Sequence, residues 1–218
     1  MDEEKLKLLG QQLRCPSGKF AEEVGASMFK SNSNMIFQTI EALDLCDGAV
    51  VLELGFGNGE HVTRLLEQFI HLNYYGIDIS EAMVSLASQK NSSWVEIGRA
   101  SFELVAPEQK LVLKGRMFDA FFSVNTVYFW EDPASKFKEI HDLLNIGGTL
   151  SIGYVEKDFG HSLPFTQQGF RFYSNKEIEG FLKDAGFSDI SFLERTEQTV
   201  AKDRNHVVRP FVVAKAVK

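Results

Sequence analysis

The segment Val51–Val62 places three glycines within five residues, directly after an apolar run and directly before a helical pattern. These glycines are Gly55, Gly57 and Gly59. Because glycine has no Cβ atom, it tolerates positive φ angles and lets another group come close to the backbone. Two interpretations follow. The turn either only connects a strand to a helix, or holds a bound ligand against bare peptide.

Strands and helices alternate along the chain on both sides of this turn. Apolar runs predict strands at residues 49–54, 73–79, 94–97, 118–124 and 149–154. Helical spacing of apolar residues recurs between most of them. Two further strands, 188–195 and 207–217, have no helix between them and are predicted to form an antiparallel hairpin. The prediction is an α/β fold, a doubly wound and mostly parallel sheet with helices on both faces.

Several helix ends are marked by capping residues. Ser80 and the pair Asp132–Pro133 are placed to begin helices. Ser174 and Glu177 have the spacing of a capping box, and Gly186 is placed to end the helix that follows.

One domain is expected, since a single core serves chains of up to roughly 250 residues and this chain has 218. We divide it into a helical N-terminal cap region (1–47), a ligand-binding core (48–154), an aromatic loop (155–173), and a C-terminal helix with the hairpin (174–218). The aromatic loop shows no regular periodicity. Long irregular loops in compact domains are commonly lids, so this segment is predicted to cover the ligand.

Composition narrows the classes of partner. The net charge is −7 and no cluster of Lys and Arg occurs, so nucleic acid is not expected. No apolar run approaches the roughly 18 residues of a membrane span, and the charged N-terminus lacks the apolar core of a signal peptide. A cytoplasmic protein is expected. The two cysteines suggest neither a disulfide nor a metal site, and the oligomeric state stays open.

The residues around the glycine turn favour a nucleoside over a dinucleotide. Asp78 ends the second predicted strand, where a carboxylate can accept hydrogen bonds from ribose hydroxyls. A dinucleotide fingerprint starting at Gly55 needs a third glycine at position 60, which is Glu60. Glu53 adds a second negative charge, which suits a pyrophosphate poorly.

At this point the chain resembles class I S-adenosylmethionine-dependent methyltransferases. Glu53–Gly59 is similar to their first motif and Gly76–Ser80 to their second, and the similarity continues through Phe118–Ala120 and Leu143–Leu150. The resemblance implies a seven-stranded sheet with an antiparallel last strand, and S-adenosylmethionine as cofactor. An acidic neighbourhood suits this cofactor, which carries a cationic sulfonium and an ammonium.

The resemblance also implies roles for individual residues. Glu53 would support the glycine loop or the methionine amino group, although a local pairing of this carboxylate is the alternative. Asp78 would hold the ribose. Contacts to the adenine would come from residues after the third strand, where Arg99 replaces an acidic residue often found there. The full set implied to bind the cofactor is Glu53, Gly55, Gly57, Gly59, Asp78, Ile79, Met83, Ala100, Ser101 and Asn125.

The chemistry of methyl transfer leaves the catalytic residues open. Asn125 and Tyr128 follow the fourth strand and are candidates to face the acceptor, the alternative being an aromatic core strand that overruns its end. His161 is the histidine best placed for a base, the alternative being a loop histidine facing solvent. His61, inside the helix after the glycine turn, is interpreted as a surface residue.

Two functions in different classes remain. The first is methyl transfer to a small-molecule acceptor by in-line displacement, favoured by the aromatic lid and the acidic charge. The second is a non-catalytic module that binds S-adenosylmethionine or S-adenosylhomocysteine. An enclosed apolar acceptor pocket beside the cofactor site would support the first function.

Overall fold

The computed structural model describes residues 3–107, 109–111, 113, 115–167, 169–200 and 206–218. The helices are α1 (Glu3–Arg14), α2 (Ala21–Glu41), α3 (Val62–Gln68), α4 (Glu81–Lys90), α5 (Ser92–Glu96), α6 (Pro133–Leu143), α7 (Lys157–Ser162) and α8 (Asn175–Ala185), with short 3₁₀ turns η1 (Gly18–Phe20), η2 (Val127–Phe129) and η3 (Pro164–Gln167). The strands are β1 (Val50–Leu54), β2 (Asn73–Asp78), β3 (Ala100–Leu104), β4 (Phe118–Val124), β5 (Leu144–Val155), β6 (Ser188–Val200) and β7 (His206–Val217).

The strands form one seven-stranded sheet in the order β3-β2-β1-β4-β5-β7-β6. Strands β1 to β5 pair in parallel, and β7 runs antiparallel to both of its neighbours. The predicted parallel sheet and terminal hairpin are therefore confirmed. The chain runs outward from β1 to β3 and then returns to β4 beside β1. This reversal is the topological switch point at which open α/β sheets bind ligands.

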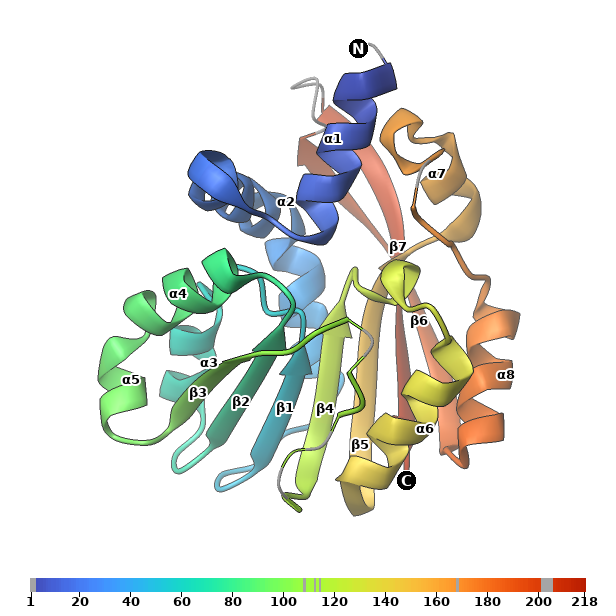
Figure 1. Cartoon of the computed structure of the whole chain (residues 1–218). Coiled ribbons are helices and arrows are strands. Elements are labelled where there is room, and N and C mark those ends of the chain that lie inside the picture. The colour runs from blue at the N-terminus through green and yellow to red at the C-terminus, as the bar shows by residue number, and fades with distance from the viewer. Residues whose placement is uncertain (1–2, 108, 112, 114, 168, 201–205) are drawn as a thin grey trace.

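Helices cover both faces of the sheet, and a further set lies beyond the ends of its strands. Helices α6 and α8 pack against each other on one face, while α2, α3 and α4 cover the opposite face (Figure 1). Helices α1 and α7 lie beyond the carboxyl ends of the parallel strands (Figure 1). Within the described residues, no helix is both long and apolar enough to cross a membrane.

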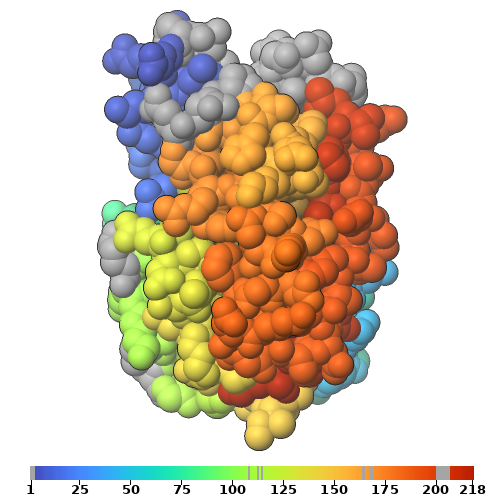
Figure 2. Space-filling view, turned by 90° about the vertical axis from the view of Figure 1, so that its right-hand side faces the viewer, coloured from blue at the N-terminus to red at the C-terminus, as the bar shows by residue number. Residues whose placement is uncertain are grey.

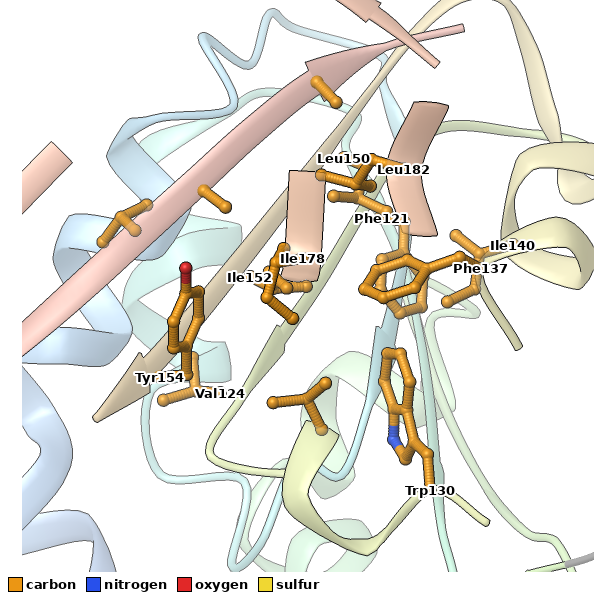
Figure 3. Close-up of a cluster of buried hydrophobic side chains, with 14 of the residues drawn as sticks. Phe121, Val124, Trp130, Phe137, Ile140, Leu150, Ile152, Tyr154, Ile178 and Leu182 are labelled. Carbon is orange, nitrogen blue, oxygen red and sulfur yellow. The ribbon is translucent and has the colours of Figure 1, made fainter. Parts of the chain in front are cut away.

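The core under α6 and α8 is built from buried apolar side chains. Phe137 and Ile140 of α6 meet Ile178 and Leu182 of α8 above Phe121 (Figure 3). The other members labelled there are Val124, Trp130, Leu150, Ile152 and Tyr154. Burying each such side chain stabilises the fold by roughly 1.5 to 3 kcal/mol.

A second core lies between the sheet and α3 and α4. Leu65 and Leu66 of α3 and Met83 of α4 are buried against Val51 and Phe122. Because the two cores hold the sheet from both sides, the carboxyl ends of β1, β2 and β4 are positioned by packing rather than by their loops.

The helix starts predicted at Ser80, Asp132 and Ser174 are confirmed. Ser80 accepts a hydrogen bond from the backbone N–H of Met83, and Asp132 accepts one from that of Ser135. Ser174 and Glu177 form a reciprocal capping box at the start of α8. Gly186 ends α8 in the left-handed conformation, with φ of 103°.

The third predicted strand is wrong. Trp94–Ile97 lies in and just after helix α5, where the Trp94 ring packs on the guanidinium of Arg99, and β3 begins only at Ala100. β3 is an edge strand with residues exposed toward its end, so it carries no continuous apolar run. The more apolar stretch just before it gave the false signal.

The segment 155–173 is more regular than predicted. It contains α7 and η3, and Glu156 caps α7 by accepting from the N–H groups of Asp158 and Phe159. The space-filling view shows this segment between the N-terminal helix and the hairpin (Figure 2). Phe172 packs so closely on Gly160 that a Cβ there would lie 2.3 Å from its ring. The segment is thus a packed cover.

The capping box of α8 offers a test of the fold. Ser174→Ala removes the hydrogen bond to the Glu177 N–H, and we expect it to lower the free energy of unfolding by about 1 kcal/mol. Ser93→Ala, at an exposed position in α5, is the matched control and should change it by less than about 0.5 kcal/mol. Urea unfolding followed by circular dichroism measures both, and equal effects would contradict the capping assignment.

Candidate active site

A cleft of about 390 Å³ lies at the carboxyl ends of β1, β2 and β4. Its floor is formed by the turn after β1, by Asp78 and Ile79 at the end of β2, and by Asn125 after β4. The N-terminal helices, the segment 155–173 and the hairpin close it from above. The covering side chains are Leu13, Arg14, Pro16, Met28, Ser31, Asn32, Leu163, Phe165, Thr166, Phe170, Phe172 and Arg209.

The three glycines of the turn serve different purposes. All three have positive φ, but a Cβ on Gly55 would lie 2.3 Å from the Thr126 side chain, and one on Gly59 would lie 2.7 Å from that of Ala87. Those two glycines allow neighbouring elements to pack. A Cβ on Gly57 would meet nothing within 4 Å, and Gly57 lines the cleft. Gly57 is therefore the glycine that leaves bare backbone toward open space.

Asp78 lies beside Gly57 and is only 6% exposed. Its Oδ2 accepts a hydrogen bond from the Gly57 N–H at 3.1 Å, and its Oδ1 accepts one from the Ser80 N–H at 2.9 Å. Burial raises the pKa of Asp78 from 3.8 to about 6, even though these N–H groups favour the charged form. A carboxylate with free lone pairs thus lines the cleft next to an open glycine.

Glu53 is buried behind the turn with two partners. Its Oε2 lies 2.8 Å from Nε2 of His61 and accepts a hydrogen bond from the hydroxyl of Tyr74. His61 is 1% exposed, so the prediction of a surface histidine is wrong. The helical pattern of the sequence could not show that Glu53 on β1 faces the start of α3, where His61 lies. Glu53 also borders a hollow of about 40 Å³ shared with Asn58 and Asn32.

The residues after β4 form a hydrogen-bonded unit. Asn125 adopts φ of 57°, and its N–H donates to the carbonyl of Gly153 on β5. The Tyr128 hydroxyl donates to Asn125 Oδ1 at 2.9 Å and accepts from the N–H of Val155. Burial raises the pKa of Tyr128 well above its ordinary value. Both residues line the cleft.

The structure does not bring every predicted residue to the cleft. Ala100 and Ser101 begin β3 opposite Tyr74 and Tyr75, at the end of the sheet remote from Asp78, and Val105 and Ala106 line the cleft instead. This difference follows from the misplaced third strand. Arg99 donates to three backbone carbonyls near α3.

His161 and Gly59 also stay outside the cleft wall. His161 is exposed on α7 with its ring centroid 5.4 Å from that of Phe172, and Gly59 faces α4. Gly55, Gly57, Asp78, Ile79, Met83 and Asn125 do line the cleft.

Some lining residues gave no signal at the sequence level. Met28 and Asn32 belong to α2, which long-range packing places over the cleft. Arg209 belongs to β7 and reaches the cleft through the long-range packing of the hairpin, so nothing in its local sequence marked it.

Curated relatives share most of this chain. The family model of the methyltransferase domain matches residues 52–152. The uncharacterised methyltransferase YdaC of Bacillus subtilis is 29% identical, over 76% of this chain and 86% of its own. The uncharacterised protein MJ1123 of Methanocaldococcus jannaschii is 30% identical over 87% of both chains. Phosphoethanolamine N-methyltransferase 1 of Triticum aestivum is 28% identical over 73% of this chain, which spans about a third (32%) of that relative.

Solved structures share the fold at lower identity. A chain from the complex between the Haloferax volcanii Trm112 methyltransferase activator and a methyltransferase matches with a TM-score of 0.72 and 17% identity, covering 91% of this chain and 95% of its own. An S-adenosylmethionine-dependent methyltransferase of Thermotoga maritima matches with a TM-score of 0.67 and 20% identity, covering 98% and 99%. With the relatives above, the fold and the glycine turn place this chain in the class I S-adenosylmethionine-dependent methyltransferases.

The different surroundings of the glycines give a paired test. Gly57→Ala adds a methyl group that meets only cleft space, so we expect weaker S-adenosylhomocysteine binding, by more than about tenfold, with a stability loss of about 1 to 2 kcal/mol from backbone strain. Gly59→Ala adds overpacking against Ala87 and should cost about 2 to 4 kcal/mol. Titration calorimetry and urea unfolding measure the two quantities. Wild-type affinity in Gly57→Ala would remove this glycine from the cofactor site.

Proposed function

We propose that this methyltransferase acts on a small-molecule acceptor by in-line displacement. The observation that carries the proposal is one continuous cleft, in which open backbone at Gly57 and the carboxylate of Asp78 adjoin a part of the cleft lined by apolar side chains. A cleft of about 390 Å³ suits a nucleoside cofactor together with a small acceptor.

The chain's residues fit S-adenosylmethionine. Asp78 is placed to accept hydrogen bonds from the ribose hydroxyls, and Gly57 leaves room beside it. Ile79 and Ala106 border the cleft where a nucleobase would lie, and Glu53 borders the smaller hollow, with a negative charge suited to the methionine ammonium. When bound, this cofactor supplies an electrophilic methyl group on a cationic sulfonium.

The acceptor end of the cleft is covered by apolar side chains. Met28 of α2 and Leu163, Phe165, Phe170 and Phe172 of the cover line it. The Phe129 and Phe170 rings meet at 4.7 Å, and so do those of Tyr128 and Phe172, so the cover packs directly on the residues after β4. Room for a second molecule beside the proposed cofactor site favours an enzyme over a non-catalytic cofactor-binding module.

Tyr128 is not a ready general base for the acceptor. The Tyr128 hydroxyl already donates to Asn125 and accepts from Val155, and its raised pKa keeps it protonated. We therefore propose that the acceptor enters as a competent nucleophile, and that the chain contributes alignment. Holding two reactants in attack geometry can supply roughly 7 to 11 kcal/mol.

Removing the Asp78 carboxylate tests the nucleoside site. Asp78→Ala should weaken S-adenosylhomocysteine binding by about 1.5 to 3 kcal/mol, the range for hydrogen bonds to a charged group. Asp184→Ala, at an exposed position on α8, is the control and should bind as the wild type does. Calorimetric titration of the folded variants measures both, and a screen of small amines, thiols, phenols and carboxylates for methylation completes the test. Unchanged affinity in Asp78→Ala would overturn the assignment.

The raised pKa of Asp78 predicts a pH dependence of binding. Ribose hydroxyls donate to the charged carboxylate, so affinity should be full above about pH 7 and fall below about pH 6, by at most about tenfold per unit. For the free protein the sign is opposite. Because the folded pKa lies above the ordinary value of 3.8, the contribution of Asp78 to stability is present below about pH 4 and is lost as pH rises through about 6. Titrations of wild type and Asp78→Asn between pH 5 and 8 check this, since a similar slope in both proteins would assign the titration to another group.

A further inference from the structure

Arg209 brings a cation to the acceptor end of the cleft. It lies on β7, its side chain is 12% exposed, and it lines the cleft together with the apolar cover. It also lies close enough to Tyr128 to influence the ionisation of that hydroxyl. Burying a guanidinium costs free energy unless it is paired and hydrogen-bonded, so its contacts matter.

The hydrogen bonds of Arg209 hold only part of its guanidinium. Its Nε donates to Glu197 Oε1 at 2.9 Å, and its Nη2 donates to the same oxygen at 2.5 Å and to the carbonyl of Ser31 at 2.7 Å. Asn34 Nδ2 donates to the other oxygen of Glu197 at 2.8 Å. Among the described residues, the guanidinium of Arg209 thus donates hydrogen bonds through Nε and Nη2. These hydrogen bonds fix the plane of the guanidinium against α2.

Of the two residues in this ion pair, only Arg209 lines the cleft. Glu197 is 9% exposed and lies outside the cleft wall, whereas Arg209 is part of it. The carboxylates that line the cleft are Asp78 after β2 and Glu131, Asp132 and Glu139 at α6, and Glu139 is paired with Lys136. A second cation, Arg14 of α1, also lines the cleft, next to Cys15, whose thiol contacts the Ile79 carbonyl. Arg209 itself places a positive charge close to the aromatic residue Tyr128.

We infer that Arg209 recognises an anionic group on the methyl acceptor, so the substrate class is a small carboxylate or phosphomonoester with an apolar body. A planar guanidinium held on one side keeps donors in a geometry that suits such oxyanions. The apolar body would lie against the cover formed by Phe165, Phe170 and Phe172. This inference rests on the proposed function, because it concerns the acceptor part of the same cleft.

Anchoring the hairpin is the competing role for this ion pair. The Thr199 hydroxyl also donates to the Ser31 carbonyl, so the pair belongs to a contact between β6, β7 and α2. An anchor would affect every acceptor alike, and removal of either partner would have the same effect. Anion recognition would affect only charged acceptors and would depend on Arg209 rather than on Glu197.

To test this, matched pairs of small probes are titrated into the protein that has S-adenosylhomocysteine bound, and their affinities are compared. One pair is phenylacetate and phenylacetamide, and the other is phenyl phosphate and phenol. In the wild type the anion of at least one pair should bind at least about tenfold tighter than its neutral partner. Arg209→Gln should remove this preference, Arg209→Lys should retain part of it, and the matched control Glu197→Gln should keep it.

Each outcome decides between the roles. Equal binding within both pairs, no binding of either anion, or an unchanged preference in Arg209→Gln would overturn the inference. The same loss in Glu197→Gln as in Arg209→Gln would also overturn it, in favour of a hairpin anchor. If Arg209→Gln does not fold, the affinities of the wild type and of Arg209→Lys for the two probe pairs still test the inference. Failure to bind S-adenosylhomocysteine in the first titration would instead contradict the proposed function.

Discussion

The hydrogen bond from the Gly57 N–H to Asp78 joins the turn after β1 to the end of β2, and the cleft depends on it. It requires two strands held in register by the cores on both faces of the sheet, with Leu54 opposite Ile77 at their carboxyl ends. It also holds a carboxylate at 6% exposure, where its charge is poorly solvated. A donor from a ligand would restore the solvation that burial removes. Fold stability and ligand affinity are therefore opposed at this residue.

The N-terminal part of the roof over the cleft is hydrogen-bonded to the residues that follow Asp78. The Ser80 hydroxyl, which caps α4, donates to the carbonyl of Pro16 at 2.5 Å, and the Cys15 thiol lies 3.6 Å from the carbonyl of Ile79. The link between α1 and α2 is thus fastened to the residues that follow Asp78. A nucleoside that orders this loop would order the N-terminal helices as well, so binding at the floor and closure of the roof are physically connected.

The sequence predicted those parts of the site that depend on local chemistry. The glycine turn, Asp78 with the cap at Ser80, and Asn125 after β4 are each determined by residues adjacent in the chain, and Gly55, Gly57, Asp78 and Asn125 line the cleft. Two features of the site could not be predicted from the sequence. β3 is an edge strand with a weak apolar pattern, so its position was misjudged and the adenine contacts were placed on Ala100 and Ser101. Arg209 reaches the cleft only because the hairpin crosses α2, a contact between residues far apart in the chain.

Charged side chains are distributed unevenly along the cleft. Asp78 lies in the wall and Glu53 behind the glycine turn, further carboxylates line the cleft at α6, and the guanidinium of Arg209 lies at the end proposed for the acceptor. A cation beside the acceptor lowers the pKa of a nearby nucleophile, because it stabilises the deprotonated form. The chain can thereby favour a reactive acceptor without a residue that removes its proton. In such a cleft the charges bind and orient the two reactants, and the apolar cover above them excludes water that would weaken these electrostatic interactions.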